Sequence, residues 1–371
     1  MKPETKHESI VPEYWEAKLN EAIDTVNQHK SNSENFSSFI FVTDIHWEKN
    51  NKNAVMLANY LKQKIGIKRF IFGGDIIMGQ LYINQSKRLV DDWLNHLKLL
   101  GSDGWYAVRG NHDNNGACLP KTPSDVWTDD EYYDNFLQYA NNANKDGSKK
   151  LYNYTDDTHA KIRYYFLDTH SSGALPQDSS KINMVSYETQ LEWLLQTVSE
   201  LNNEWGIIII QHRIFNLIPL KENVVLTKEM QALIPTVNDC DFPSFDNNGM
   251  VISPILKRKK GDGFPICDEF STVLIPVLNR ISADISAPDV IGVITGHAHF
   301  DAALKTRAGY SIICTTCDAG GSSSRKYDNY NPYRIPNTTI EQVLDIIQID
   351  RTNRKLFLTR LGPGHNREFT Y

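Results

Sequence analysis

The segment FIFVTDIH, residues 39–46, carries the transition on which the fold prediction rests. Residues 39–43 form a continuous apolar and β-branched run, which is typical of a strand that is covered on both faces. The run stops at Asp44, and His46 follows one position later. Side chains at alternate positions of an extended chain point the same way, so this pair can hold a single ion. We therefore predict a buried strand with metal-binding chemistry at its carboxyl end.

The same pattern recurs in the next 70 residues or so. Periodic and apolar runs predict helix, strand, helix and strand at residues 54–65, 69–72, 85–100 and 106–108. Asp75 follows the second strand, and Asn111 and His112 follow the third. Because βαβ crossovers are right-handed, the carboxyl ends of these three strands should lie at one edge of a parallel sheet.

The second half of the chain offers two more such strand ends. Strands are predicted at 163–168, 206–210, 290–295 and 311–314, and helices at 186–201 and 272–281. His212 follows the second of these strands, and His297 and His299 follow the third. The last residues, 342–350 and 355–361, read as a closing hairpin, which we expect on a second sheet.

Length and pattern favour one large α/β domain. We expect residues 1–35 to form a lead-in segment with an amphipathic helix at 13–28, and residues 36–371 to form the domain itself. Insertions are expected near 114–156, with a short helix near 132–139, and near 214–268, where prolines and glycines are frequent. The basic run at 257–260 is expected to be a solvated face rather than a phosphate site.

Composition limits the functional classes to which the protein can belong. Hydrophobic residues make up 40% and charged residues 23%, and the net charge of −6 gives no reason to expect a general nucleic-acid surface. The five cysteines are too few for a disulfide scaffold, and Cys314 and Cys317 are expected to be packed thiols rather than a zinc knuckle. No export signal or membrane span is evident. We expect a cytoplasmic protein, or alternatively one associated with a phage particle.

Five strand ends therefore carry oxygen and imidazole donors. Taken singly, a strand-end Asp is commonly a turn former or helix cap, and a lone His is commonly a satisfied polar residue. Five strand ends that all carry such donors are improbable by chance. Oxygen and imidazole donors with few thiols suit manganese, iron or zinc, and their number suits two ions better than one.

The motifs DIH, GGD, GNHD, QH and GHAH, in this order between Asp44 and His299, resemble the calcineurin-like metallophosphoesterase family. The resemblance implies a four-layer α/β/β/α sandwich with two mixed β-sheets and a dinuclear metal site. It also implies that Asp44, His46 and His299 hold one metal ion and that Asp75 bridges both. The second ion would then be held by the remaining ligands, which are Asn111, His212 and His297.

The resemblance further implies hydrolysis of a phosphate ester by hydroxide formed between two divalent or trivalent ions. His112 would protonate the leaving oxygen or stabilise the transition state, with Asp113 orienting its ring. Arg213 and His170 are candidates for contacting a nonbridging phosphate oxygen. A small phosphodiester is the favoured substrate, with no membrane partner. The alternatives are a phosphomonoesterase or protein phosphatase, a nuclease, and a non-catalytic scaffold of the same fold.

Overall fold

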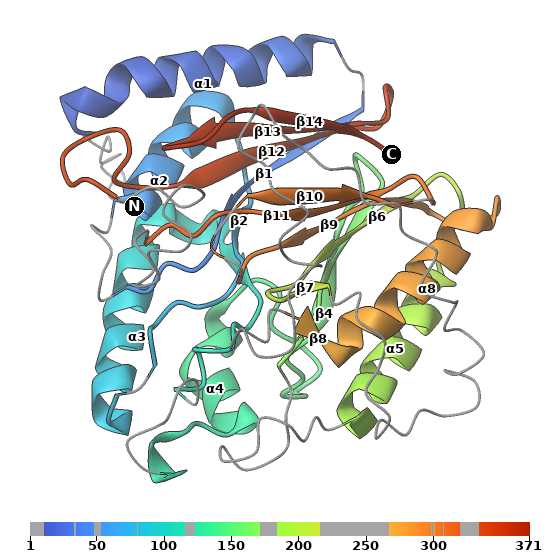
Figure 1. Cartoon of the computed structure of the whole chain (residues 1–371), viewed down its shortest axis with the longest axis horizontal. Helices are drawn as coiled ribbons and strands as arrows, with labels where there is room; N and C mark the ends of the chain where they lie inside the picture. The colour runs from blue at the N-terminus through green and yellow to red at the C-terminus, as the bar shows by residue number, and fades with distance from the viewer. Residues whose placement is uncertain are drawn as a thin grey trace, which may run out of the picture.

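The computed structural model describes most of the chain. The described residues are 11–32, 35–47, 53–79, 81–115, 123–170, 184–215, 267–297, 299, 301–306, 308–319 and 334–371. Two six-stranded sheets lie face to face, and helices cover the outer face of each (Figure 1). This arrangement is the predicted four-layer α/β/β/α sandwich with two mixed sheets.

The first sheet has the strand order β14-β13-β12-β1-β2-β3. β1, β2 and β3 are parallel, whereas β12, β13 and β14 pair antiparallel. The bounds, in chain order from β1, are Phe36–Val42, Phe70–Phe72, Trp105–Ala107, Leu344–Asp350, Lys355–Leu361 and Arg367–Thr370.

The second sheet has the strand order β10-β11-β9-β6-β5-β4. Its central strands β5, β6, β9 and β11 are parallel, and β4 and β10 are antiparallel edges. The bounds, in chain order from β4, are Asn153–Asp157, Ile162–Phe166, Gly206–Ile210, Asp289–Thr295, Ala302–Lys305 and Ser311–Cys314. Two short strands, β7 (Ile214–Phe215) and β8 (Cys267–Asp268), pair separately.

The helices form the two outer layers (Figure 1). Those packed outside the first sheet are α1 (Glu13–Ser31), α2 (Ala54–Ile65) and α3 (Ile83–Leu97), and the short α4 (Asp129–Asn135) joins the same core. Those packed outside the second sheet are α5 (Met184–Val198) and α8 (Glu269–Ala283). No helix in the described part of the chain combines the length and apolar character that crossing a membrane requires.

Alternation along β1 explains why its sequence is continuously apolar. Ile40 and Val42 face the helices, while Phe39 and Phe41 face the second sheet. The second sheet divides in the same way: Ile208 and Ile210 of β6 face the first sheet, and their neighbours face α5 and α8. Both faces of each central strand are therefore buried, as the run at 39–43 predicts.

Most predicted elements are confirmed to within a few residues, but several strand predictions need correction. β4 lies inside the excursion expected at 114–156, and β10 and β14 have no counterpart among the predicted strands. All three are edge strands, whose solvated positions weaken the apolar pattern. The closing hairpin β12–β13 joins the first sheet, because β12 pairs antiparallel with β1 (Phe36 opposite Asp350).

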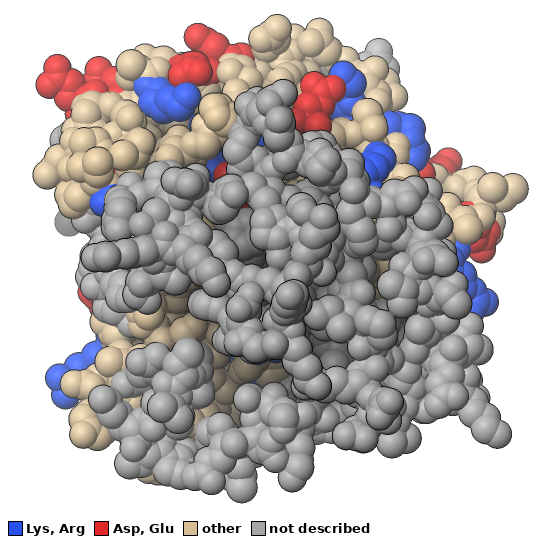
Figure 2. Space-filling view, viewed as in Figure 1, with Lys and Arg blue, Asp and Glu red and all other residues tan. Residues whose placement is uncertain are grey.

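Some predictions concern residues outside the described ranges. These are Cys118, Cys240, the basic run at 257–260, most of the segment 214–268, and the loop from 320 to 333. On the described part of the face in Figure 2, acidic and basic side chains are interspersed over the outer helix and the hairpin. The charge on that part is thus not gathered into one patch.

Candidate metal centre

The polar strand ends of both sheets meet at one edge of the sandwich. The backbone N–H of Asp44, after β1, donates to Gly74 O (2.9 Å), and that of Gly296, after β9, donates to His212 O (2.9 Å). The two sheets are joined here, since His297 N–H donates to Asp44 Oδ2 (2.9 Å). The ring of His212, from the second sheet, donates from Nδ1 to Gly73 O of the first (2.7 Å). Predicted ligands far apart in sequence are thus held in place by hydrogen bonds that involve the backbone.

One group of potential ligands consists of Asp44, His46, Asp75 and His299, whose donor atoms all lie within 4.8 Å of one another. His299 Nε2 is 3.1 Å from Asp44 Oδ1 and 3.4 Å from His46 Nε2. Asp44 Oδ1 is buried and has no hydrogen-bond partner among the described residues. A buried carboxylate oxygen facing imidazole nitrogens is the arrangement a cation satisfies.

The second group consists of Asp75, His212 and His297, again within 4.8 Å. His212 Nε2 is 3.3 Å from Asp75 Oδ2 and 3.0 Å from Asn111 Oδ1. Because His212 Nδ1–H donates to Gly73 O, Nε2 is the ring nitrogen that faces these two oxygens. Asp75 belongs to both groups, so the donor set fits two cations that share one carboxylate.

The backbone at these ligands is strained in a consistent way. Nine non-glycine residues of the described chain have positive φ, and five of them are predicted ligands. These five are Asp44 (51°), His46 (43°), Asp75 (56°), His297 (70°) and His299 (60°). Left-handed backbone is costly for L-residues and tends to cluster at functional sites. Here it turns each side chain towards the common centre directly after its strand.

Two glycines make room for the carboxylates. A Cβ on Gly110 would lie 2.1 Å from Asp75 Oδ1, and one on Gly296 would lie 2.6 Å from Asp44 Oδ2. Both distances are shorter than any van der Waals contact. The glycines of the GNHD and GHAH motifs are therefore required by close packing against the ligands.

The electrostatics of the centre favour added positive charge. Burial opposes charge on Asp75, but His212 and His112 hold the pKa of that carboxyl well below its usual range. Burial also opposes charge on the ring of His212, but Asp75 raises the pKa of His212 to about 9. Burial lowers the pKa of His46 and of His297 to about 3, which leaves these rings neutral and able to donate a lone pair. The site thus combines carboxylates that stabilise positive charge, as on His212, with the neutral rings of His46 and His297, and this combination suits divalent cations.

His112 lies beside both groups without belonging to either. Its Nε2 is 3.9 Å from Asp75 Oδ2, and its ring lies 5.2 Å from that of His46. Its Nδ1 is 2.5 Å from Met78 O, a contact that assigns the proton to Nδ1. The carbonyl of Met78 therefore orients this ring, and no sequence pattern indicated it.

Asp113 is buried, and its described hydrogen bonds go to the backbone. Oδ2 accepts from Gly110 N (2.7 Å) and Asp75 N (3.1 Å), and Oδ1 accepts from Ile76 N (2.6 Å). Asp113 thus ties the turn after β3 to the turn after β2. These contacts support the positions of Asp75 and Asn111 rather than the ring of His112.

Arg213 and His170 follow the neighbouring strands β6 and β5 at the same edge. Arg213 N–H donates to Thr169 Oγ1 (3.3 Å), and Nε of Arg213 is buried without a hydrogen-bond partner in the described chain. Burial and then the charge of Arg213 lower the pKa of His170 well below its usual value, so the two side chains lie close together. The guanidinium of Arg109, which precedes the GNHD motif, already donates hydrogen bonds to Asp168 and Asp129.

The segment 315–319 adds contacts that the sequence did not reveal. Asp318 N and Ala319 N donate to the carbonyls of Thr43 and Asp44 (3.0 and 3.2 Å). Burial opposes charge on the ring of His299, but the Cys317 side chain, together with Asp44, raises the pKa of His299 well above its usual value. Cys314 and Cys317 are buried thiols, as predicted, and Cys317 also contacts a predicted ligand.

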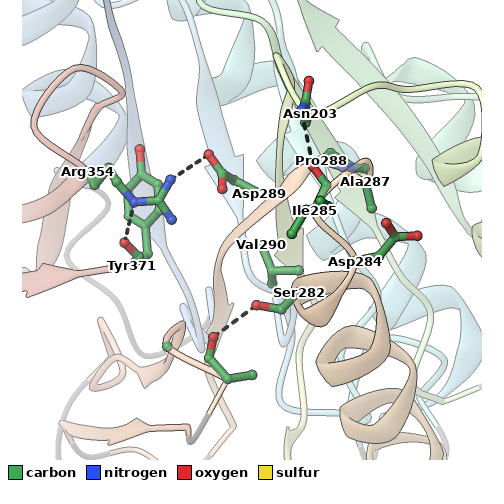
Figure 3. A pocket seen from close by; sticks show the side chains of 12 residues that line it. Asn203, Ser282, Asp284, Ile285, Ala287, Pro288, Asp289, Val290, Arg354 and Tyr371 are labelled. Atoms are coloured by element: carbon green, nitrogen blue, oxygen red, sulfur yellow. Dashed lines mark hydrogen bonds and ion pairs between the residues drawn. The ribbon is translucent and has the colours of Figure 1, made fainter.

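A separate cavity lies at the opposite end of β9. It has a volume of about 360 Å³ and is lined by Asp289, Val290, Ser282 and Ile285 among others (Figure 3). Arg354 on its wall is bonded to Asp289 (2.8 Å) and lies over the ring of Tyr371. Within the described chain, the groups with metal-ligand geometry lie at the other edge.

Comparisons with known proteins agree with this geometry. A sequence profile described as calcineurin-like phosphoesterase matches residues 37–229. The fold is similar to the crystal structure of a dimetal phosphatase from Danio rerio, with a TM-score of 0.54 and 13% identity over 90% of this chain and 99% of that one. Among curated proteins, none matches in sequence.

Proposed function

Since the chain belongs to the calcineurin-like phosphoesterase family, whose members hydrolyse phosphoric esters at dinuclear metal centres, we propose that it cleaves a small phosphodiester. The observation that carries the proposal is the pair of ligand groups that share Asp75. In this assignment Asp44, His46 and His299 hold one ion. The other ligands, Asn111, His212 and His297, hold the second. Bound ions of this kind supply Lewis-acid stabilisation for charge on phosphoryl oxygens.

His112 is proposed as the general acid. With its Nδ1 proton donated to Met78 O, the nitrogen that exchanges a proton is Nε2, on the side of Asp75. A protonated Nε2 can donate to the leaving oxygen as the ester bond breaks. Asp113 is proposed to act on this step indirectly, because it holds the backbone turn that carries Asn111 and His112.

Arg213 is proposed to bind a nonbridging phosphate oxygen. Its Nε is buried without a hydrogen-bond partner in the described chain. After burial, its positive charge is the next or a further cause of the lowered pKa values of His170 and His297. Guanidinium groups bind phosphate oxygens by charge-assisted hydrogen bonds. The side chain thus has an unused donor beside the second ligand group.

Charge supports a diester over a monoester. Near the centre, in the described part of the chain, Arg109 is already neutralised by Asp168 and Asp129, whereas Arg213 keeps an unbonded Nε. A phosphodiester carries one negative charge and a monoester close to two at neutral pH. One available arginine therefore matches the diester better.

The test combines metal analysis with a substrate pair. We expect about two ions per chain, and turnover of bis-p-nitrophenyl phosphate that is lost on chelation and restored by manganese, iron or zinc. Preference for p-nitrophenyl phosphate would overturn the diesterase assignment but leave a phosphoesterase. If metal analysis finds no bound ions, the proposed metal centre itself is wrong.

The alternatives are separated by the same assay. Cleavage of single-stranded or duplex DNA in preference to the small diester would indicate a nuclease, and a phosphopeptide preference would indicate a protein phosphatase. Two bound ions without turnover of any of these substrates would indicate a scaffold.

A further inference from the structure

A buried group of charged side chains lies behind the metal centre, on strands that the family profile does not reach. It consists of Asp345 on β12, Arg360 on β13, Arg367 on β14, and Asp301, two residues after His299. We name these four residues the Arg–Asp cluster. Asp345 and Arg360 are direct cross-strand partners, so the antiparallel hairpin itself brings them together.

Several charge-assisted hydrogen bonds join the members of the cluster. Arg360 bonds to both oxygens of Asp301 (2.7 and 2.9 Å) and, through Nε, to Asp345 (2.8 Å). Arg367 reaches Asp301 as well (2.8 Å) and also bonds to Asp345. Arg360 is 1% exposed and Asp345 is fully buried. Two positive and two negative charges are thus balanced in an interior where each alone would be costly.

Hydrogen bonds connect the cluster to His299. Asp301 Oδ1 accepts from Thr316 N (3.1 Å), and Thr316 Oγ1 donates to the carbonyl of His299 (2.9 Å). On the same segment, Thr315 Oγ1 donates to Asp345. The cluster is therefore connected to His299 in two ways. Asp301 lies two residues after it in the chain, and the segment 315–316, which bonds to the cluster, also donates to the carbonyl of His299.

His299 is a predicted ligand that needs such support. Its side chain is 26% exposed, whereas those of Asp44, Asp75 and His212 are at most 1% exposed. It also has a left-handed backbone, which must be imposed by its surroundings. Buried ion networks add little net stability compared with apolar packing. Geometric control of a ligand is a better account of this one.

We propose that the Arg–Asp cluster positions His299 and thereby sets the affinity of one of the two metal ions, the one held with Asp44 and His46. The proposed ligands of the second ion are His212, His297 and Asn111. The hydrogen bonds of the two histidines run to Gly73, Asn111 and Asp44, which lie outside the cluster. The inference rests on the proposed metal centre. It assigns a positioning role to residues of the C-terminal strands, remote from the ester.

The experiment is a titration of the purified chain with Mn²⁺ by calorimetry, which resolves two affinities. Asp301→Asn keeps the size of the side chain but removes the charge that both arginines bind. We expect it to weaken one ion by about tenfold or more and to leave the other within about twofold. His299→Ala serves as the reference, since it should weaken the same ion.

A matched control separates positioning from general damage. Arg163→Met breaks another largely buried ion pair, in which Arg163 contacts both oxygens of Asp156 (2.8 and 2.9 Å). That pair joins β4 and β5 and has no described bond to a ligand. We expect lower stability from this variant but unchanged affinity for both ions.

Thr316→Val provides a second measurement that does not disturb the charges. It removes the hydroxyl donor to His299 O, and it should weaken the same ion by a smaller factor. Equal weakening of both ions by Asp301→Asn, or unchanged affinities, would overturn the inference. Should Asp301→Asn fail to fold, unchanged affinities in Thr316→Val overturn it. Failure of the wild-type chain to bind ions would instead overturn the proposed function.

Discussion

Gly110→Ala is the sharpest perturbation of the centre, because one added methyl group meets the shared carboxylate. The new Cβ would lie 2.1 Å from both N and Oδ1 of Asp75. Reaching an ordinary contact of 3.4 Å requires a relative shift of about 1.3 Å. Metal–ligand distances tolerate only about 0.2 Å. Asp75 could therefore not contact both proposed ions after this substitution.

The expected loss follows from that shift. A misplacement of about 1 Å in a catalytic constellation costs on the order of 100-fold in rate. We expect Gly110→Ala to lose at least that much turnover of bis-p-nitrophenyl phosphate, together with one or both ions. Metal content by mass spectrometry and turnover with added Mn²⁺ measure the two effects separately.

Gly66→Ala is the matched control. Gly66 ends α2 with φ +71°, and a Cβ there meets no atom within 4 Å. We expect a stability loss of about 1 to 2 kcal/mol from the left-handed backbone, with both ions and turnover retained. The reasoning is refuted if a folded Gly110→Ala chain binds two ions with wild-type affinity and turns over within about twofold of wild type.

Three further predictions address the acid, the core and the N-terminal helix. His112→Ala should reduce turnover by about 10² to 10⁴-fold while both ions stay bound; retained turnover in steady-state assays would rule out the general acid. Trp15→Ala, at a fully buried position of α1, should lower the free energy of unfolding by about 3 to 5 kcal/mol in urea titrations, and a loss below about 1 kcal/mol would show that α1 contributes little to the core. Burial opposes charge on Glu341, but hydrogen bonds from Trp15, Tyr14 and Asn53 lower its pKa below 4.5. The ionised carboxylate therefore stabilises the fold fully above about pH 4.5, and this stabilisation is lost as the pH falls through the lowered pKa. Glu341→Gln should remove this part of the acid sensitivity in thermal melts between about pH 3 and 6. An unchanged pH profile of stability would contradict this prediction.

The strands and the donor residues at their ends were predictable because both depend on local sequence. Apolar runs that end in Asp, Asn or His mark where β1, β2, β3, β6 and β9 stop, and the structure places each end within a few residues. Edge strands were missed because one of their faces is solvated. β4, for example, reads Asn153–Asp157, with three acidic or amide residues among five.

The orienting contacts could not be predicted, because their partners are set by chain crossings. A carbonyl such as that of Met78 carries no side-chain signal at all. In the Arg–Asp cluster, Arg360 meets Asp301 across 59 positions of sequence. Nothing local distinguishes such an arginine from one on the surface.

The sequence by itself determined the chemistry of the centre: which donors exist, that each follows a buried strand, and that they resemble the ligands of one enzyme family. The tertiary structure alone decided how they are grouped. Asp75 is shared because the ends of two separate sheets meet at one edge, joined by His297 N–H to Asp44 and by His212 to Gly73. Donor type is a property of each residue, whereas grouping depends on the packing of one sheet on another.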